Sequence, residues 1–378
     1  MLVLAVVLAI FVYGMIAATL GTILPDLSER FHLTPSQNGN IAFAQALGLM
    51  LASLGVGPLL DAEGKKVGLI LGLSLISIAL FALPRVRGFK GILSLLFILG
   101  VGGGIVITGA NALASDVGNA HRASMLNMVN LFFGLGGFVT PFIAANLFRK
   151  NWIRLCYSIA AFSSLTLVLE IATRMPGPTG VHDFMLANIG QVLGRPMVLL
   201  LGLFLFLYVS CEVGVWNWLP RHLIAQGIPE SRALNILSMG FALGLLLGRL
   251  LASSILLKTS ATTVTLMASI VMAVTTFLML RTKRPAAALI LVGLAGLSMA
   301  PVFPTVLAIV ADVSPQMTST AIGFAITCGW LGLAVSSRVI GAIAGGDPLR
   351  LRKALHVIPA AALLMIVLSV VIRATLHS

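Results

Sequence analysis

The residues best suited to chemistry stand at every fourth position of one apolar run. Tyr208, Glu212 and Trp216 share a helix face, because helical positions four apart lie above one another. That face offers a phenol, a carboxylate and an indole, which suit a small solute with apolar C–H faces and hydroxyl groups. An ionisable group is too costly at bilayer depth to serve as mere packing. The face therefore predicts a binding cavity for a polar solute such as a sugar.

Other polar and aromatic residues inside apolar runs are candidates for the same cavity. They are Tyr13, Gln45, Asn111, Asn130, Asn217 and Trp330. The alternative for the amides is structural, since Asn and Gln side chains hydrogen-bond neighbouring helices within membranes. Both interpretations stay open for each amide.

Three ionisable residues lie well inside apolar runs: Glu212, Arg249 and Arg338. We expect Arg249 to organise helix ends, whereas an ion pair between Glu212 and Arg338 is a hypothesis for coupling. Glu212 either exchanges a proton during a conformational cycle, or stays charged and accepts hydrogen bonds from substrate hydroxyls. Glu170 lies near the end of its run, four residues before Arg174, which predicts an interfacial i,i+4 ion pair.

The composition indicates which kind of element positions these residues. Of 378 residues, 59% are hydrophobic and 9% are charged, and the mean hydropathy is +1.08. Soluble domains carry about 25% charged residues, so the composition excludes a soluble enzyme, a nucleic-acid-binding module and a disordered chain. The net charge of +13 comes from short basic clusters between apolar runs, where lipid headgroups and membrane orientation explain it. We expect an integral, multi-pass protein of a bacterial inner (plasma) membrane.

Apolar runs long enough to span a bilayer, about 20 residues each, number twelve. They cover 2–24, 38–60, 67–84, 91–115, 125–147, 154–173, 196–219, 232–256, 263–280, 287–312, 319–345 and 353–373. Backbone groups in hydrocarbon must pair internally, and the runs are too long for barrel strands, so helices are predicted. The fold class is therefore an all-α membrane protein of twelve transmembrane helices. The segment 174–195, which opens with Pro and Gly, is predicted to be a central cytoplasmic linker. It divides the chain into an N-terminal six-helix half (1–173) and a C-terminal six-helix half (196–378).

An internal repeat supports the two halves. Residues 46–51, ALGLML, match residues 242–247, ALGLLL, at an offset of 196 positions. The same offset relates Asp116 to Asp312, and Gly136 to Gly332. Two parallel repeats with a site at the bilayer midplane between them are an arrangement of secondary transporters.

The loop between the second and third spans reads GPLLDAEGKK over residues 57–66. Gly57 permits two helices to approach closely, and Asp61 suits the positive N-terminal end of a neighbouring helix across the interface of the halves. We expect Lys65 and Lys66 to bind carbonyls or carboxylates, and Gly64 to complete a gating element with these residues. The bland alternative is a solvated charged turn.

This loop resembles the signature loop of the major facilitator superfamily, Gly-x-Leu-x-Asp-Arg-x-Gly-Arg-Lys, with Ala62 and Lys65 in place of its two arginines. In that superfamily the loop is cytoplasmic, which implies a cytoplasmic N-terminus. The positive-inside rule favours the reverse, because most basic residues would then lie outside. We give the motif priority.

Finer motifs resemble the fucose and glucose permease branch of the superfamily. They are Thr108–Asn111 (TGAN), Leu126–Asn127, Tyr208–Trp216 (YVSCEVGVW) and Phe303–Thr305 (FPT). Proton-coupled fucose carriers have acids where this chain has Gly21 and Ile107, so coupling here cannot use those two positions.

The resemblance and the residues together predict a secondary carrier that works by alternating access, with a monosaccharide as substrate and protons as candidate coupling ions. Alternatives are a sugar uniporter, and an exporter of amphipathic or drug-like compounds, to which the Gly- and Pro-containing segment Gly134–Pro141 points. A membrane-embedded enzyme or a receptor is the rival of another class, but no catalytic cluster occurs at membrane depth. We expect a monomer in contact with membrane lipids, no enzymatic activity, and no cofactor, metal or nucleic-acid partner.

The orientation is testable by labelling. With a cytoplasmic N-terminus, a cysteine introduced within 61–66 reacts with an impermeant thiol reagent only from the cytoplasm, and one within 85–90 only from outside. The opposite pattern would overturn both the orientation and the assignment of the loop.

Overall fold

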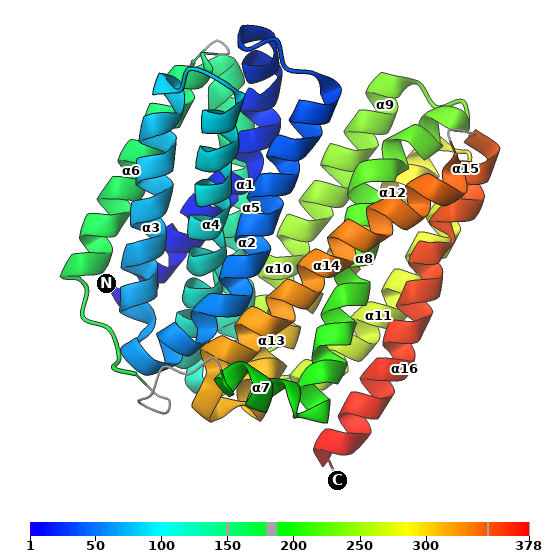
Figure 1. The fold of residues 1–378 in the computed structure, drawn as a ribbon. Helices are drawn as coiled ribbons and strands as arrows, with labels where there is room; N and C mark the ends of the chain where they lie inside the picture. Colours follow the sequence, from blue (N-terminus) through cyan, green and yellow to red (C-terminus); the bar gives the residue numbers. More distant parts are fainter. Residues whose placement is uncertain (149–150, 179–186, 346–347, 378) are drawn as a thin grey trace. The chain divides into compact units, whose positions relative to one another are not determined.

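The computed structural model describes all residues except 149–150, 179–186, 346–347 and 378. The predicted linker, 174–195, lies partly outside these described residues. Within them the secondary structure is helical and contains no strand (Figure 1). This confirms the all-α fold class, because an apolar chain satisfies its backbone groups most simply within each helix.

Long helices account for the first half of the chain. They are α1 (Leu2–Arg30), α2 (Pro35–Glu63), α3 (Lys65–Ala82), α4 (Phe89–Gly118), α5 (Arg122–Asn146) and α6 (Trp152–Ala172). The turn between α4 and α5 is a 3-10 element, Asn119–His121, in which Asn119 has φ of +41°. Asparagine tolerates this left-handed region better than most residues.

The second half is more interrupted. Its elements are α7 (Ala187–Leu193), α8 (Pro196–Ala225), α9 (Glu230–Asn235), the π-helical turn η3 (Ile236–Ala242), α10 (Leu243–Ile255), α11 (Ala261–Met279), α12 (Pro285–Met299), α13 (Val302–Val313), α14 (Thr318–Ala344), α15 (Pro348–Leu355) and α16 (Val357–His377). The predicted spans 232–256 and 287–312 are therefore each built from shorter helices. In the second of them the break falls at Ala300–Pro301, where proline cannot donate a backbone hydrogen bond.

Eleven helical stretches of the described residues are long and apolar enough to cross a membrane. One of them, Phe89–Asn146, contains both α4 and α5. The chain is an integral multi-pass membrane protein, whereas the count of twelve spans stays a prediction.

The helices pack as two compact units. Unit 1 comprises Met1–Asn119, Val129–Gly194 and Ser314–Thr327, and unit 2 comprises Ala120–Met128, Arg195–Val313 and Cys328–Ser378. The first turns of α14 thus pack within unit 1, although they follow α13 in sequence. The first turns of α5 likewise pack within unit 2.

Glycines bring helices into backbone contact at repeat-related positions. In unit 1, a Cβ on Gly48 of α2 would lie 2.4 Å from the Phe97 carbonyl oxygen of α4. In unit 2, a Cβ on Gly244 of α10 would lie 2.4 Å from the Gly293 carbonyl oxygen of α12. The offset of 196 relates Gly48 to Gly244 and Phe97 to Gly293. The repeat seen in the sequence therefore extends to the packing of its helices.

This packing predicts opposite effects for two substitutions in α2. Gly48→Ala places a methyl group against the α4 backbone, and overpacking costs roughly 1–3 kcal/mol. Gly55→Ala meets no atom within 4 Å and gains up to about 1 kcal/mol of helix propensity. We expect the midpoint of thermal unfolding in detergent to fall for Gly48→Ala and to hold or rise for Gly55→Ala. Equal midpoints would contradict the close approach.

Candidate functional site

The turn between α2 and α3 is shaped by two glycines. Gly57 lies one turn before Asp61, and a Cβ there would lie 2.4 Å from the Cα of Thr320 in α14. Gly64 joins the two helices at φ of +92°, a conformation that side chains disfavour. Glycine at these two positions lets α2 touch α14 and then reverse directly into α3.

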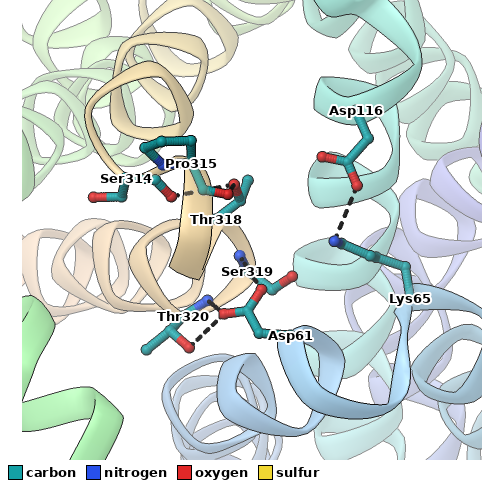
Figure 2. Close-up of polar contacts among 8 residues, drawn as sticks. All are labelled: Asp61, Lys65, Asp116, Ser314, Pro315, Thr318, Ser319 and Thr320. Carbon is teal, nitrogen blue, oxygen red and sulfur yellow. Dashed lines mark hydrogen bonds and ion pairs between the residues drawn. The ribbon is translucent and has the colours of Figure 1, made fainter. Parts of the chain in front are cut away.

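Asp61 occupies the N-terminal end of α14 (Figure 2). Its Oδ1 accepts a hydrogen bond from the Ser319 backbone N–H at 2.9 Å, and its Oδ2 accepts one from the Thr320 N–H at 2.9 Å. The Thr320 hydroxyl donates to Oδ2 at 2.7 Å. These three bonds, named here the Asp61 latch, confirm the predicted contact of Asp61 with a helix N-terminus.

The latch replaces an ordinary N-cap. The amides of Ser319 and Thr320 belong to the first turn of α14, whose N–H groups have no intrahelical acceptor. A 3-10 turn, Pro315–Met317, precedes them, and the Thr318 hydroxyl donates back to the carbonyls of Ser314 and Pro315 at 3.2 Å each. The carboxylate therefore supplies acceptors that the local sequence does not. Asp61 is buried, with 2% of its surface exposed, so its charge depends on these donors.

The sequence did not identify Ser319 and Thr320 as partners of Asp61. Backbone amides carry no residue signature, but one signal was available in the offset of 196. At this offset Thr320 corresponds to Ser124, in the first turn of α5, and Gly57 corresponds to Ser253 of α10. These two equivalents are also in contact, because the Ser124 hydroxyl donates to the Ser253 carbonyl at 2.6 Å.

Lys65 binds a carboxylate, which is one of the two kinds of partner predicted for the lysines of this loop. Its Nζ lies 3.0 Å from Oδ2 of Asp116 at the end of α4, and only 2% of the lysine side chain is exposed. The repeat-related acid, Asp312 at the end of α13, pairs with Arg122 in the first turn of α5. Both acids thus hold a cation at a helix start.

Lys66 binds carbonyls, the other predicted option. Its Nζ donates to the carbonyls of Ile171 and Thr173 at 2.7 and 2.9 Å, at the end of α6. The neighbouring Glu170 is fully buried, and it forms no ion pair with Arg174 among the described residues. The expected interfacial Glu170–Arg174 pair is therefore wrong, because the Glu170 side chain is buried whereas Arg174 is exposed.

Four candidate binding residues belong to unit 1, and all four are buried. The Asn130 side-chain amide donates to Oδ1 of Asn111 at 2.7 Å, and the Asn111 amide donates to the Ile107 carbonyl at 2.8 Å. The ring of Tyr13 stacks on Phe133 with centroids 5.4 Å apart. The backbone of Gln45 packs against Gly100. The amide pair fits the structural alternative as well as a binding role.

Five candidates belong to unit 2. Tyr208 is buried and interacts electrostatically with Glu212 and with Arg249 of α10. Trp216 is 36% exposed and meets Phe241 of η3 edge to face at 5.2 Å. The remaining two are Asn217, which donates to the Ser337 hydroxyl at 3.4 Å, and the half-buried Trp330.

Arg249 of α10, which sequence reasoning had assigned to helix ends, therefore interacts with Tyr208 on the polar face of α8. Glu212 is half-buried and Arg338 is exposed. Within the described residues, these two side chains form no ion pair in this structure. Their joint coupling role stays a prediction.

Comparisons with known proteins agree with the fold. A family model described as Major Facilitator Superfamily matches residues 6–337. The glucose/mannose transporter GlcP of Bacillus subtilis is 24% identical over 383 residues, covering 97% of this chain and 93% of GlcP. Bypass of stop codon protein 6 of Saccharomyces cerevisiae is 24% identical over 66% of this chain, and the chain spans 55% of that protein's length. A structure of the E. coli fucose:proton symporter FucP superposes with a TM-score of 0.84 at 18% identity, covering 98% of each chain.

The latch predicts a graded response to substitution. Asp61→Asn replaces a charged acceptor, whose interaction with a helix N-terminus is worth roughly 0.3–2 kcal/mol, by an amide with one oxygen. We expect the ratio of latched to unlatched protein to fall by about 2- to 30-fold. Thr320→Val removes only the hydroxyl donor and gives a smaller shift, and Glu29→Gln, an exposed acid, gives none. The measurement is the distance distribution between spin labels at the exposed positions 63 and 316. A distribution unchanged in Asp61→Asn would refute the latch.

Proposed function

The chain belongs to the Major Facilitator Superfamily, and we propose that it is a secondary carrier that moves a small polar solute across a plasma membrane by alternating access. We propose a monosaccharide as the substrate and proton symport as the mode of coupling. The proposal needs no covalent chemistry from the chain.

The Asp61 latch is the observation that carries the proposal. It joins the end of α2 to the start of α14 by three hydrogen bonds. A carboxylate at a helix N-terminus is stabilised by an amount that thermal fluctuation and ligand binding can overcome. A carrier needs such a contact, because it must form in one state of the cycle and break in another.

The candidate binding residues favour a sugar. Hydroxyl groups need donors and acceptors held in place, which the Asn111–Asn130 pair and Glu212 offer, while aromatic rings such as Trp216 accept the apolar face of a sugar ring. GlcP, which is similar to this chain over nearly its full length, carries glucose and mannose by its name. The fucose:proton symporter FucP shares the fold.

We assign coupling to Glu212 because the chain lacks acids at positions 21 and 107, and because Glu212 lies one helical turn from Tyr208 and interacts with it electrostatically. Its titration would link a proton to substrate binding on the same helix face. If Glu212 instead stays charged throughout, the carrier is a uniporter, and the carboxylate serves only as a hydrogen-bond acceptor.

Uptake into proteoliposomes separates these roles. We expect uptake of one or more labelled monosaccharides from a panel, and an inward proton gradient should accelerate it. A protonophore should abolish accumulation of the sugar against its concentration gradient. Glu212→Gln keeps size and most hydrogen bonding but cannot titrate, so it should still exchange substrate and fail to accumulate it. Glu29→Gln, at an exposed position, should accumulate normally.

Two results would overturn parts of the proposal. Wild-type uptake indifferent to both pH and protonophore would remove the coupling role of Glu212 and favour the uniporter. Failure to transport any sugar, with export of an amphipathic dye instead, would replace the sugar proposal by the exporter.

A further inference from the structure

Glu170 is a buried carboxyl group that the transport proposal does not use. It lies in the last turn of α6, its side chain is fully buried, and among the described residues neither of its carboxylate oxygens has a hydrogen-bond partner. It is not one of the candidate binding residues, and it directly precedes Ile171, whose carbonyl accepts a hydrogen bond from Lys66. Such a group requires a physical explanation, because buried carboxylates are normally paired or hydrogen-bonded.

The surroundings of Glu170 oppose a negative charge. The C-terminal end of a helix carries the negative end of its dipole, so an ionised acid in the last turn is repelled. Burial without donors adds the cost of desolvation. The protonated form avoids both costs, since a neutral carboxyl group loses far less on burial.

One cation is close enough to change that balance. Lys66 of α3 interacts electrostatically with Glu170, but its ammonium is bound to the carbonyls of Ile171 and Thr173 and forms no ion pair with the acid in the described part of the chain. The other charged groups near this end are engaged or exposed: Lys65 pairs with Asp116, and Glu63 of α2 and Met1 at the start of α1 are exposed. Arg174, which follows α6, is exposed and forms no ion pair with the acid within the described structure.

We propose that Glu170 is a proton-binding site, protonated while the Asp61 latch is closed and ionised when Lys66 leaves the α6 carbonyls to pair with it. The two arrangements differ by one proton, which Glu170 releases to the water at this end of the helices. The ammonium keeps its charge and exchanges two carbonyl acceptors for one carboxylate.

The link to the latch is short. Asp61, Lys65 and Lys66 lie within six residues of the sequence. The helix α3 begins at Lys65, directly after Gly64, so Lys66 lies in its first turn. We expect a rearrangement of this turn on opening of the latch to draw Lys66 away from the α6 carbonyls. Proton release therefore favours the open latch, and acid favours the closed one. The proposed proton site rests on the proposed carrier cycle in one respect, which is that the latch opens and closes.

The proton itself is visible by infrared spectroscopy. We expect the purified wild-type protein to show a carbonyl-stretching band of a protonated carboxyl group that disappears as the pH is raised. Glu170→Gln should lack this band, and Glu29→Gln, which changes an exposed acid, should keep it. Lys66→Met removes the cation that stabilises the ionised form, so the band should persist to higher pH.

The coupling is measured separately, by the distance between spin labels at positions 63 and 316 in a background free of Cys156, Cys211 and Cys328. One proton changes the ratio of closed to open latch by up to about tenfold per pH unit. We expect this dependence in the wild type and in Glu29→Gln, its displacement to higher pH in Lys66→Met, and a closed latch at every pH in Glu170→Gln.

A Glu170→Gln protein that retains the wild-type pH dependence, or one that retains the infrared band, overturns the proposal. Neither measurement involves substrate. Failure of sugar uptake with both results intact would refute the transport proposal alone, and the reverse outcome would refute the proton site alone.

Discussion

The carboxylate of Asp61 acts as the N-cap of a helix that it does not belong to, and much of the surrounding structure follows from that. It must reach two adjacent backbone amides of α14, which requires contact of the helix backbones at Gly57 and an immediate reversal at Gly64. It must also be buried, which leaves no water to replace the donors. The interaction is worth roughly 0.3–2 kcal/mol, whereas an unpaired buried polar group costs about 1–3 kcal/mol or more. The latch is therefore stable only in full register, and a partly opened state is disfavoured.

The repeat does not reproduce this latch in the other unit. At the offset of 196, Asp61 corresponds to Leu257, and the contact of Gly57 with Thr320 corresponds to that of Ser253 with Ser124. A neutral hydrogen bond there replaces a charged acceptor with three donors. Hydrogen bonds to charged groups are roughly twice as strong as neutral ones. The two symmetry-related contacts thus differ in strength, and in unit 1 the charged contact adjoins two lysines that have no counterparts at 261 and 262.

Sequence reasoning found what depends on composition and local spacing. Apolar length predicted the helices, the offset of 196 predicted their repeated packing, and the charge of Asp61 predicted its contact with a helix N-terminus. It missed what depends on the neighbours of a residue. The π-helical turn Ile236–Ala242 is encoded by packing rather than by local residue types. The burial of Glu170 has no local signature either, since spacing alone suggests an interfacial pair with Arg174. The same holds for Arg249, whose nearness to Tyr208 depends on how α8 meets α10.

The cost of charge in a membrane orders the ionisable groups into two sets. At the turn that follows α2, each charge has a defined partner: Asp61 has amides, Lys65 has Asp116, and Lys66 has carbonyls. On the face of α8, Glu212 is half-buried beside a phenol and an arginine. The first set is complete without a ligand, as a structural contact must be. The second set keeps a carboxylate half-buried in an apolar helix, a costly arrangement that fits the proposed contact with a polar solute or a proton. We therefore expect holding the latch and binding the solute to be tasks for different charges, placed on different helices.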